Sequence, residues 1–149
     1  MTRLSDLLPG TWELRSRIDH SIDGSIHPDP ALGPDPVAWL IYDRAGHFAA
    51  QFMKRDRSTP MPDAPAAPGA NNSRARGGYD AYFGTYAVDD DAGEVTQRLV
   101  GAMSPENVGH VLTRAMQAGA TELVIRLDTT AWDGTPVTRT LTWQRIAPG

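Results

Sequence analysis

The sequence predicts an all-β fold in which about eight antiparallel strands form a closed, up-and-down barrel. Short runs of alternating apolar and polar residues follow one another along most of the 149 residues. Turns that contain glycine separate most of these runs, as at 43–46, 90–93 and 133–136. A meander of this size removes its exposed edges by closing on itself. The expected strands are 11–20, 37–42, 47–53, 83–88, 95–102, 111–118, 122–128 and 137–146.

Length and composition predict one globular domain over residues 1–149. Apolar residues make up 40% of the chain and charged residues 21%, which excludes a disordered tail or a coiled coil. No apolar run approaches the roughly 18 residues of a membrane span, and the first residues lack the apolar segment of a signal peptide. With no cysteine and a net charge of −4, we expect a cytoplasmic protein with no disulfide and no nucleic-acid partner.

Two proline-rich connections interrupt the regular spacing of the strands. The first covers residues 19–35, and the second covers residues 54–78. In the second, Asn72 can cap a short helix that runs to Tyr82. A connection this long is either functional or a solvated surface loop, and both readings stay open. If it is functional, we expect residues 54–78 to form a lid over the mouth of the barrel.

Side-chain alternation indicates which residues face the interior. On the first strand, Trp12 and His20 share the apolar face, and Arg139 is in phase with the apolar residues of the last strand. Arg139 can stack on Trp12 or Trp143 as a structural plug. Aromatic walls with a few polar groups are typical of ligand pockets. The candidate ligand-binding residues are Tyr42, Phe48, Phe52, Tyr86, Gln97, Leu99, Arg114, Met116 and Ile125.

Several segments resemble the lipocalin-like domain proteins of bacteria and fungi. The Gly-x-Trp signature stands at residues 10–12, and the other matching segments are LGPDP at 32–36, LIYD at 40–43, YFGTY at 82–86 and LTWQR at 141–145. The resemblance runs from about Leu7 to Ile146. It implies a barrel around a ligand cavity with a short N-terminal helix. It also implies that Trp12 plugs the closed end beneath an arginine of the last strand, either Arg139 or Arg145.

The catalytic chemistry that the sequence still allows is acid–base catalysis inside a cavity. The four histidines are scattered without metal-ligand spacing, so we expect neither a metal nor a cofactor. His20 and His110 are the candidate proton carriers, since both are expected near the barrel mouth.

The leading functional hypothesis is binding of a small, mostly apolar molecule that carries a carbonyl, carboxylate or phenol. The alternative is a cofactor-free cyclase or isomerase, which the resemblance allows because similar barrels in biosynthetic clusters have such activities. We expect a monomer or a homodimer. Strand alternation gives no reason to expect a large apolar patch on the outside of the barrel, which an interaction module would need.

Overall fold

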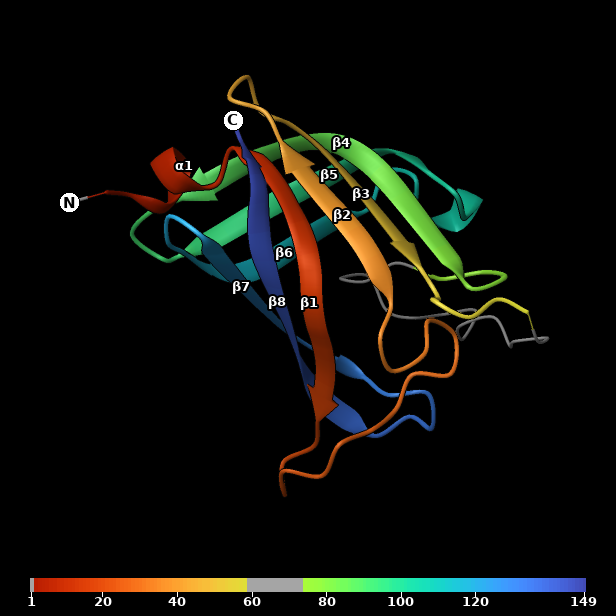
Figure 1. Ribbon diagram of the computed structural model, residues 1–149. Coiled ribbons are helices and arrows are strands. Elements are labelled where there is room, and N and C mark those ends of the chain that lie inside the picture. Colours follow the sequence, from red (N-terminus) through yellow and green to blue (C-terminus); the bar gives the residue numbers. More distant parts are fainter. Residues whose placement is uncertain (1, 59–73) are drawn as a thin grey trace.

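The computed structural model describes residues 2–58 and 74–149, and these form a closed eight-stranded barrel (Figure 1). Each strand pairs with the next in antiparallel fashion, and the last strand pairs with the first. The predicted fold class is therefore confirmed. A short helix, α1 (Leu4–Leu7), precedes the barrel. The strands are β1 (Gly10–His20), β2 (Val37–Tyr42), β3 (His47–Met53), β4 (Tyr79–Asp89), β5 (Glu94–Ala102), β6 (Val111–Ala118), β7 (Glu122–Thr130) and β8 (Pro136–Pro148).

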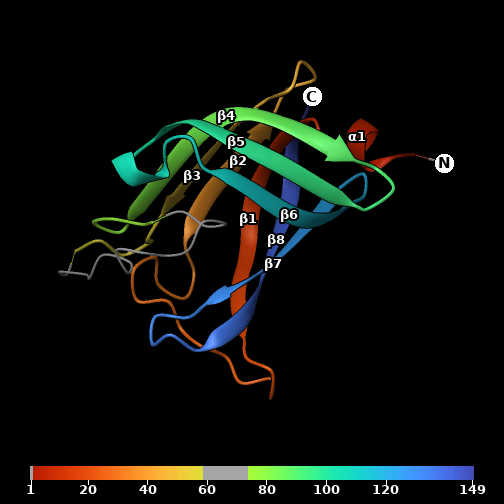
Figure 2. The same ribbon diagram turned by 180° about the vertical axis from the view of Figure 1, so that it is seen from behind.

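The barrel has two different ends, which Figures 1 and 2 show from opposite sides. One end, here called the closed end, carries α1, the C-terminus and the tight turns that follow β2, β4 and β6. The other, here called the open end, carries the connection 21–36, the turn 131–135 and the segment 103–110. That segment includes the 3₁₀ turn η1 (Pro105–Asn107). No helix in the described residues is long and apolar enough to cross a membrane.

The expected helix between Asn72 and Tyr82 is wrong over its described part. Residues 74–78 form a turn, and β4 begins at Tyr79 rather than at the predicted Phe83. Gly77 and Gly78 have φ angles of 59° and 74°, which a right-handed helix cannot contain. Most of the predicted lid, residues 59–73, lies outside the described residues.

A β-bulge in β1 changes which of its residues face the interior. Leu14 pairs with Trp143 of β8, but Ser16 pairs with Thr142, so Arg15 is an extra residue in the ladder. Beyond the bulge the two faces of β1 are exchanged. Asp19 is therefore buried, although simple alternation places it outside and His20 inside. The predicted inner face of β1 is wrong from Ser16 onward, and this displaces His20 from the interior.

Candidate functional site

The closed end is sealed by Trp12 and Arg145. The Trp12 ring is fully buried, and its Nε1 donates to the carbonyl of Leu8 at 2.9 Å. The Arg145 guanidinium lies 4.2 Å from the centre of the indole ring. It also donates to the carbonyls of Leu7, Pro9 and Ala120, the last two at 2.7 and 2.8 Å. Of the two candidate arginines, the structure places Arg145 on Trp12, and Arg139 lies at the other end of β8.

Four charged side chains gather at the open end, and we call them the charged collar: Arg17, Asp19, Asp29 and Arg139. Arg17 Nη1 lies 2.6 Å from Asp29 Oδ2, and Arg139 binds Asp19 through two contacts of 2.8 and 3.1 Å. The exposed fraction of the Asp19 side chain is 3% and that of Arg17 is 8%. Asp29 belongs to the connection 21–36, so its ion pair fastens this connection to the barrel wall.

Burial and neighbouring charges shift the pKa values in the collar. Burial lowers the pKa of Arg17, and the nearby Arg139 lowers it further, against the opposing effect of Asp29 and Asp19. Burial pushes the pKa of Asp29 upward, but Arg17, the backbone amide of Ala31 and Arg139 outweigh this effect. The pKa of Asp29 therefore lies below its ordinary value, and the carboxylate is charged at neutral pH.

Three predicted polar residues lie buried in the barrel. The exposed fractions of Tyr42, Gln97 and Arg114 are 1%, 3% and 6%. Gln97 Nε2 donates to Tyr42 Oη at 2.6 Å, and Arg114 Nη1 donates to the carbonyl of Thr113 at 3.1 Å. Burial strongly raises the pKa of Tyr42, so its phenol stays neutral. Burial lowers the pKa of Arg114, but a guanidinium remains protonated at any physiological pH.

A series of aromatic rings runs along one side of the interior, and we call it the aromatic wall. Each ring contacts the next at centroid distances of 4.8 to 6.4 Å. The apolar candidates Leu99, Met116 and Ile125 are buried on β5, β6 and β7. The wall consists of Tyr86, Tyr42, Phe48, Tyr82, Phe52 and Trp143.

Two members of the aromatic wall were not predicted as ligand contacts. Tyr82 falls within the expected helix that does not form, and Trp143 was considered only as a ring on which Arg139 could stack. Trp143 is 1% exposed, and its indole Nε1 has no hydrogen-bond partner among the described residues. Tyr86, in contrast, lies toward the closed end, is half-buried and donates its hydroxyl to the carbonyl of Asp43. Its hydroxyl is therefore engaged with the β2–β3 turn.

The two candidate proton carriers have different surroundings. His20 forms a bridge with Ile26 at the end of β1 and is away from the interior face. His110 precedes β6, and its backbone N–H donates to the carbonyl of Asn107 at 3.0 Å. Within residues 2–58 and 74–149, neither His110 Nδ1 nor the two amide atoms of the fully buried Asn107 find a partner. Of the two histidines, only His110 thus has an uncommitted buried ring atom.

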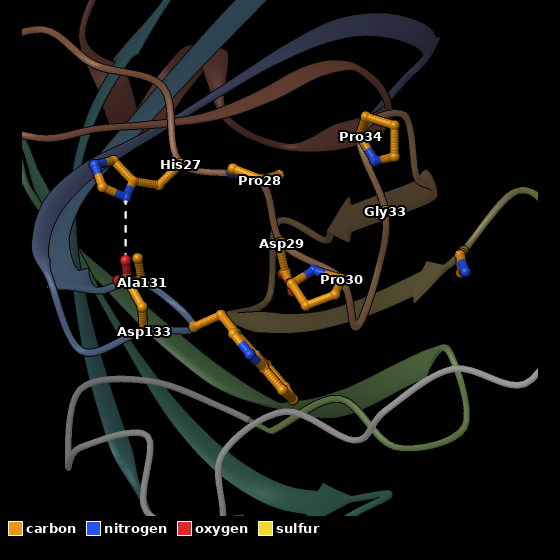
Figure 3. Close-up of a pocket in the computed structure, with 10 residues that line it drawn as sticks. His27, Pro28, Asp29, Pro30, Gly33, Pro34, Ala131 and Asp133 are labelled. Carbon is orange, nitrogen blue, oxygen red and sulfur yellow. Dashed lines mark ion pairs between the residues drawn. The ribbon is translucent and has the colours of Figure 1, made fainter.

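A pocket of about 450 Å³ lies beside the collar at the open end (Figure 3). It forms where the connection 21–36 meets the turn 131–135, and Asp29 belongs to both the pocket and the collar. Across it, His27 Nδ1 lies 3.8 Å from Asp133 Oδ2. Among the described residues, no three His, Asp or Glu side chains are placed to hold a metal ion. The pocket is lined by His27, Pro28, Asp29, Pro30, Gly33, Pro34, Lys54, Ala131, Trp132 and Asp133.

Comparison with known proteins agrees with this architecture. A family model described as a lipocalin-like domain matches residues 9–146, which spans the barrel from the start of β1 nearly to the end of β8. No curated protein matches the chain. Because the match covers most of the sequence and the structure is a closed eight-stranded barrel with a tryptophan at its closed end, the chain belongs to the lipocalin-like domain family.

Proposed function

We propose that this protein binds one small, mostly apolar molecule inside the barrel, with a carbonyl, carboxylate or phenol directed at Gln97 and Arg114. The observation that carries the proposal is a group of buried polar side chains, Tyr42, Gln97 and Arg114, beside the aromatic wall. An eight-stranded barrel is just wide enough to enclose one small ligand. Pockets for such ligands combine apolar walls with a few placed polar groups.

The polar groups around the aromatic wall favour a ligand that accepts hydrogen bonds. A guanidinium is a donor only, and the neutral phenol of Tyr42 has a proton to donate. Trp143 Nε1 is a further donor, with no acceptor among the described residues. A carbonyl or carboxylate oxygen matches these donors, and the apolar part of the ligand would contact Phe48 and Phe52.

Entry through the open end follows from the plug at the closed end. Trp12 and Arg145 occupy the closed end and are held by backbone carbonyls that do not depend on a ligand. The open end presents the charged collar and the 450 Å³ pocket. A ligand that enters there would pass the ion pairs of the charged collar before it reaches Arg114.

The test uses an anilinonaphthalenesulfonate dye, displaced by an aromatic carboxylic acid or by its methyl ester. Arg114→Met is expected to weaken binding of the acid about 10- to 100-fold, the usual effect of losing a hydrogen bond to a charged group, and to weaken binding of the ester less. Arg126→Met is the matched control, because Arg126 is exposed on the outside of β7 and should leave both affinities unchanged. Absence of dye binding to the folded protein, or equal losses for acid and ester, would contradict the proposal.

A cofactor-free cyclase or isomerase is the second candidate, and the surroundings of His110 favour it. Among the described residues His110 Nδ1 has no partner, and neither has the buried amide of Asn107 three positions earlier, so the same segment of the open end supplies a proton carrier and a polar group. The expected signature is a change in the NMR spectrum of a bound ligand after incubation, at unchanged mass. His110→Gln should abolish this change and retain binding, whereas His20→Gln should have no effect. Conversion that survives in the His110→Gln protein would exclude this role.

A further inference from the structure

The outer surface of β2 to β5, together with the segment 103–110 that follows β5, carries an exposed apolar area, which we call the apolar face. Strand alternation gave no reason to expect it, and that expectation is wrong for this side of the barrel. Its six large side chains have exposed fractions between 42% and 57%. They are Trp39, Ile41, Phe83, Val100, Met103 and Val108.

The side chains of the apolar face are neighbours across the sheet. Ile41 pairs with Ala49, Ala49 pairs with Phe83, and Phe83 pairs with Gly101 on four successive strands. The Phe83 ring packs directly on Gly101, where a Cβ atom would lie 2.4 Å from the ring. Beside it, small side chains leave a groove of about 300 Å³ between Phe83 and Met103. The ring is therefore held in place with its outer side toward solvent.

Charge is absent from the centre of this face and present at its margin. Across the middle of the four strands the outward residues are apolar or neutral, such as Gln51 between Trp39 and Ala81. Trp39 Nε1 donates to Glu13 Oε2 at 3.0 Å, so its polar edge is satisfied at the border. The opposite side of the barrel differs, because β7 carries Glu122, Arg126 and Asp128 on its outer surface.

We infer that the apolar face is the contact surface of a homodimer. Six large apolar side chains that are each about half exposed amount to several hundred Å² of surface, which is the size of the largest patch usual on a monomeric protein. Two copies that cover this face would together bury on the order of 1,000 Å², which reaches the size of a specific protein interface.

A second copy suits the charge distribution of this face. A two-fold axis brings like residues together, so a charged centre would repel its own copy, whereas an uncharged centre does not. The margin carries both signs, with Glu13 near Trp39 and Arg98 on β5, so each copy can offer opposite charges to the other. The inference does not depend on the proposed ligand, because the face lies outside the barrel wall.

The test is sedimentation velocity over a range of micromolar concentrations on the full chain and on two matched variants. Ile41→Glu lies within the face, and Ile26→Glu lies outside it in the connection 21–36 at the open end; the exposed fractions of the two side chains are 42% and 65%. We expect the wild type and Ile26→Glu to sediment as dimers. We expect Ile41→Glu to raise the dimer dissociation constant at least about 100-fold, because the two-fold axis places two new charges in the interface.

Circular dichroism of each variant checks that the barrel is intact. Phe83→Glu repeats the test at a second position of the face. A wild type that is monomeric throughout the concentration range would overturn the inference. So would equal dimerisation of Ile41→Glu and Ile26→Glu, which would place the interface elsewhere. Flotation of monomeric protein with phosphatidylcholine vesicles would also overturn it and would assign the face to a lipid surface.

Discussion

The two ends of the barrel use arginines of the same strand in different ways. At the closed end Arg145 covers an indole ring and binds backbone carbonyls, which are neutral. At the open end Arg139 binds the carboxylate of Asp19 in the barrel wall, and Arg17 binds Asp29 from a connecting loop. Six positions separate the two arginines of β8. Arg145 is held by ring packing and carbonyl dipoles, whereas Arg139 is held by a negative charge.

Because of this difference, the closed end mainly stabilises the barrel, whereas the open end lies where a ligand would reach the interior. Within the part of the chain that the structure describes, the plug contacts no carboxylate, so protonation of acids leaves its interactions in place. The collar depends on ionised aspartates, and buried ion pairs add less net stability than equal apolar packing. The closed end should therefore contribute most to the free energy of unfolding, and the open end should respond to pH.

The largest expected effect is at the plug. Trp12→Ala removes a fully buried indole and should lower the free energy of unfolding by about 4 kcal/mol. Urea unfolding followed by circular dichroism measures this change. Trp132→Ala is the control at the open end, since that ring is 45% exposed and its loss should change stability far less. Equal losses for the two variants would show that the plug is not the main source of stability.

The next effect is at the collar. Asp19→Ala leaves the guanidinium of Arg139 buried without its carboxylate partner. It should therefore lower the free energy of unfolding by about 3 kcal/mol. The double variant Asp19→Ala with Arg139→Met removes both charges and should recover most of this loss, because no unpaired charge is left in the collar and Arg17 keeps its partner Asp29. Asp35→Ala breaks an exposed pair with Arg55 and should have little effect. A double variant no more stable than Asp19→Ala would show that Arg139 is stabilised by other contacts.

Much of the fold was predictable from the sequence, because it depends on period-two alternation and turn residues. The interior positions of β2, β3, β6 and β7, and those of β5 as far as Leu99, follow strict alternation, and Tyr42, Gln97 and Arg114 are buried as expected. Alternation also indicated that Arg139 faces inward. It did not indicate which arginine of β8 covers Trp12, because this depends on where each end of β8 lies relative to β1.

The collar was not predictable, because one extra residue decides it. Residues 11–20 alternate without any visible interruption, and only the pairing with β8 shows that Arg15 is the bulge. Without the bulge, the side chain of Asp19 would face solvent. With the bulge, it is buried and binds Arg139. The apolar face was missed for a different reason. Exposed apolar residues at isolated positions are ordinary, and only the strand register brings Ile41, Phe83 and Met103 to one surface.

The smallest expected effect is on the pH dependence that distinguishes the two ends. Asp29→Asn retains the side-chain oxygen that accepts from the Ala31 amide at 2.9 Å but removes the charge that binds Arg17. This substitution should lower the free energy of unfolding by about 1 to 2 kcal/mol at neutral pH. The folded-state pKa of Asp29 lies below its unfolded value of about 3.9, so its contribution is complete above that value and disappears as the pH falls through the folded pKa. The stability difference between wild type and Asp29→Asn, measured by urea unfolding from neutral to strongly acidic pH, should therefore be constant above about pH 5 and should shrink below about pH 4. The stability deficit of Trp12→Phe at the closed end should stay constant over the same range, because none of the described contacts of the plug involves a carboxylate. A difference for Asp29→Asn that persists unchanged into strong acid would show that the loop is held by contacts other than the ion pair with Arg17.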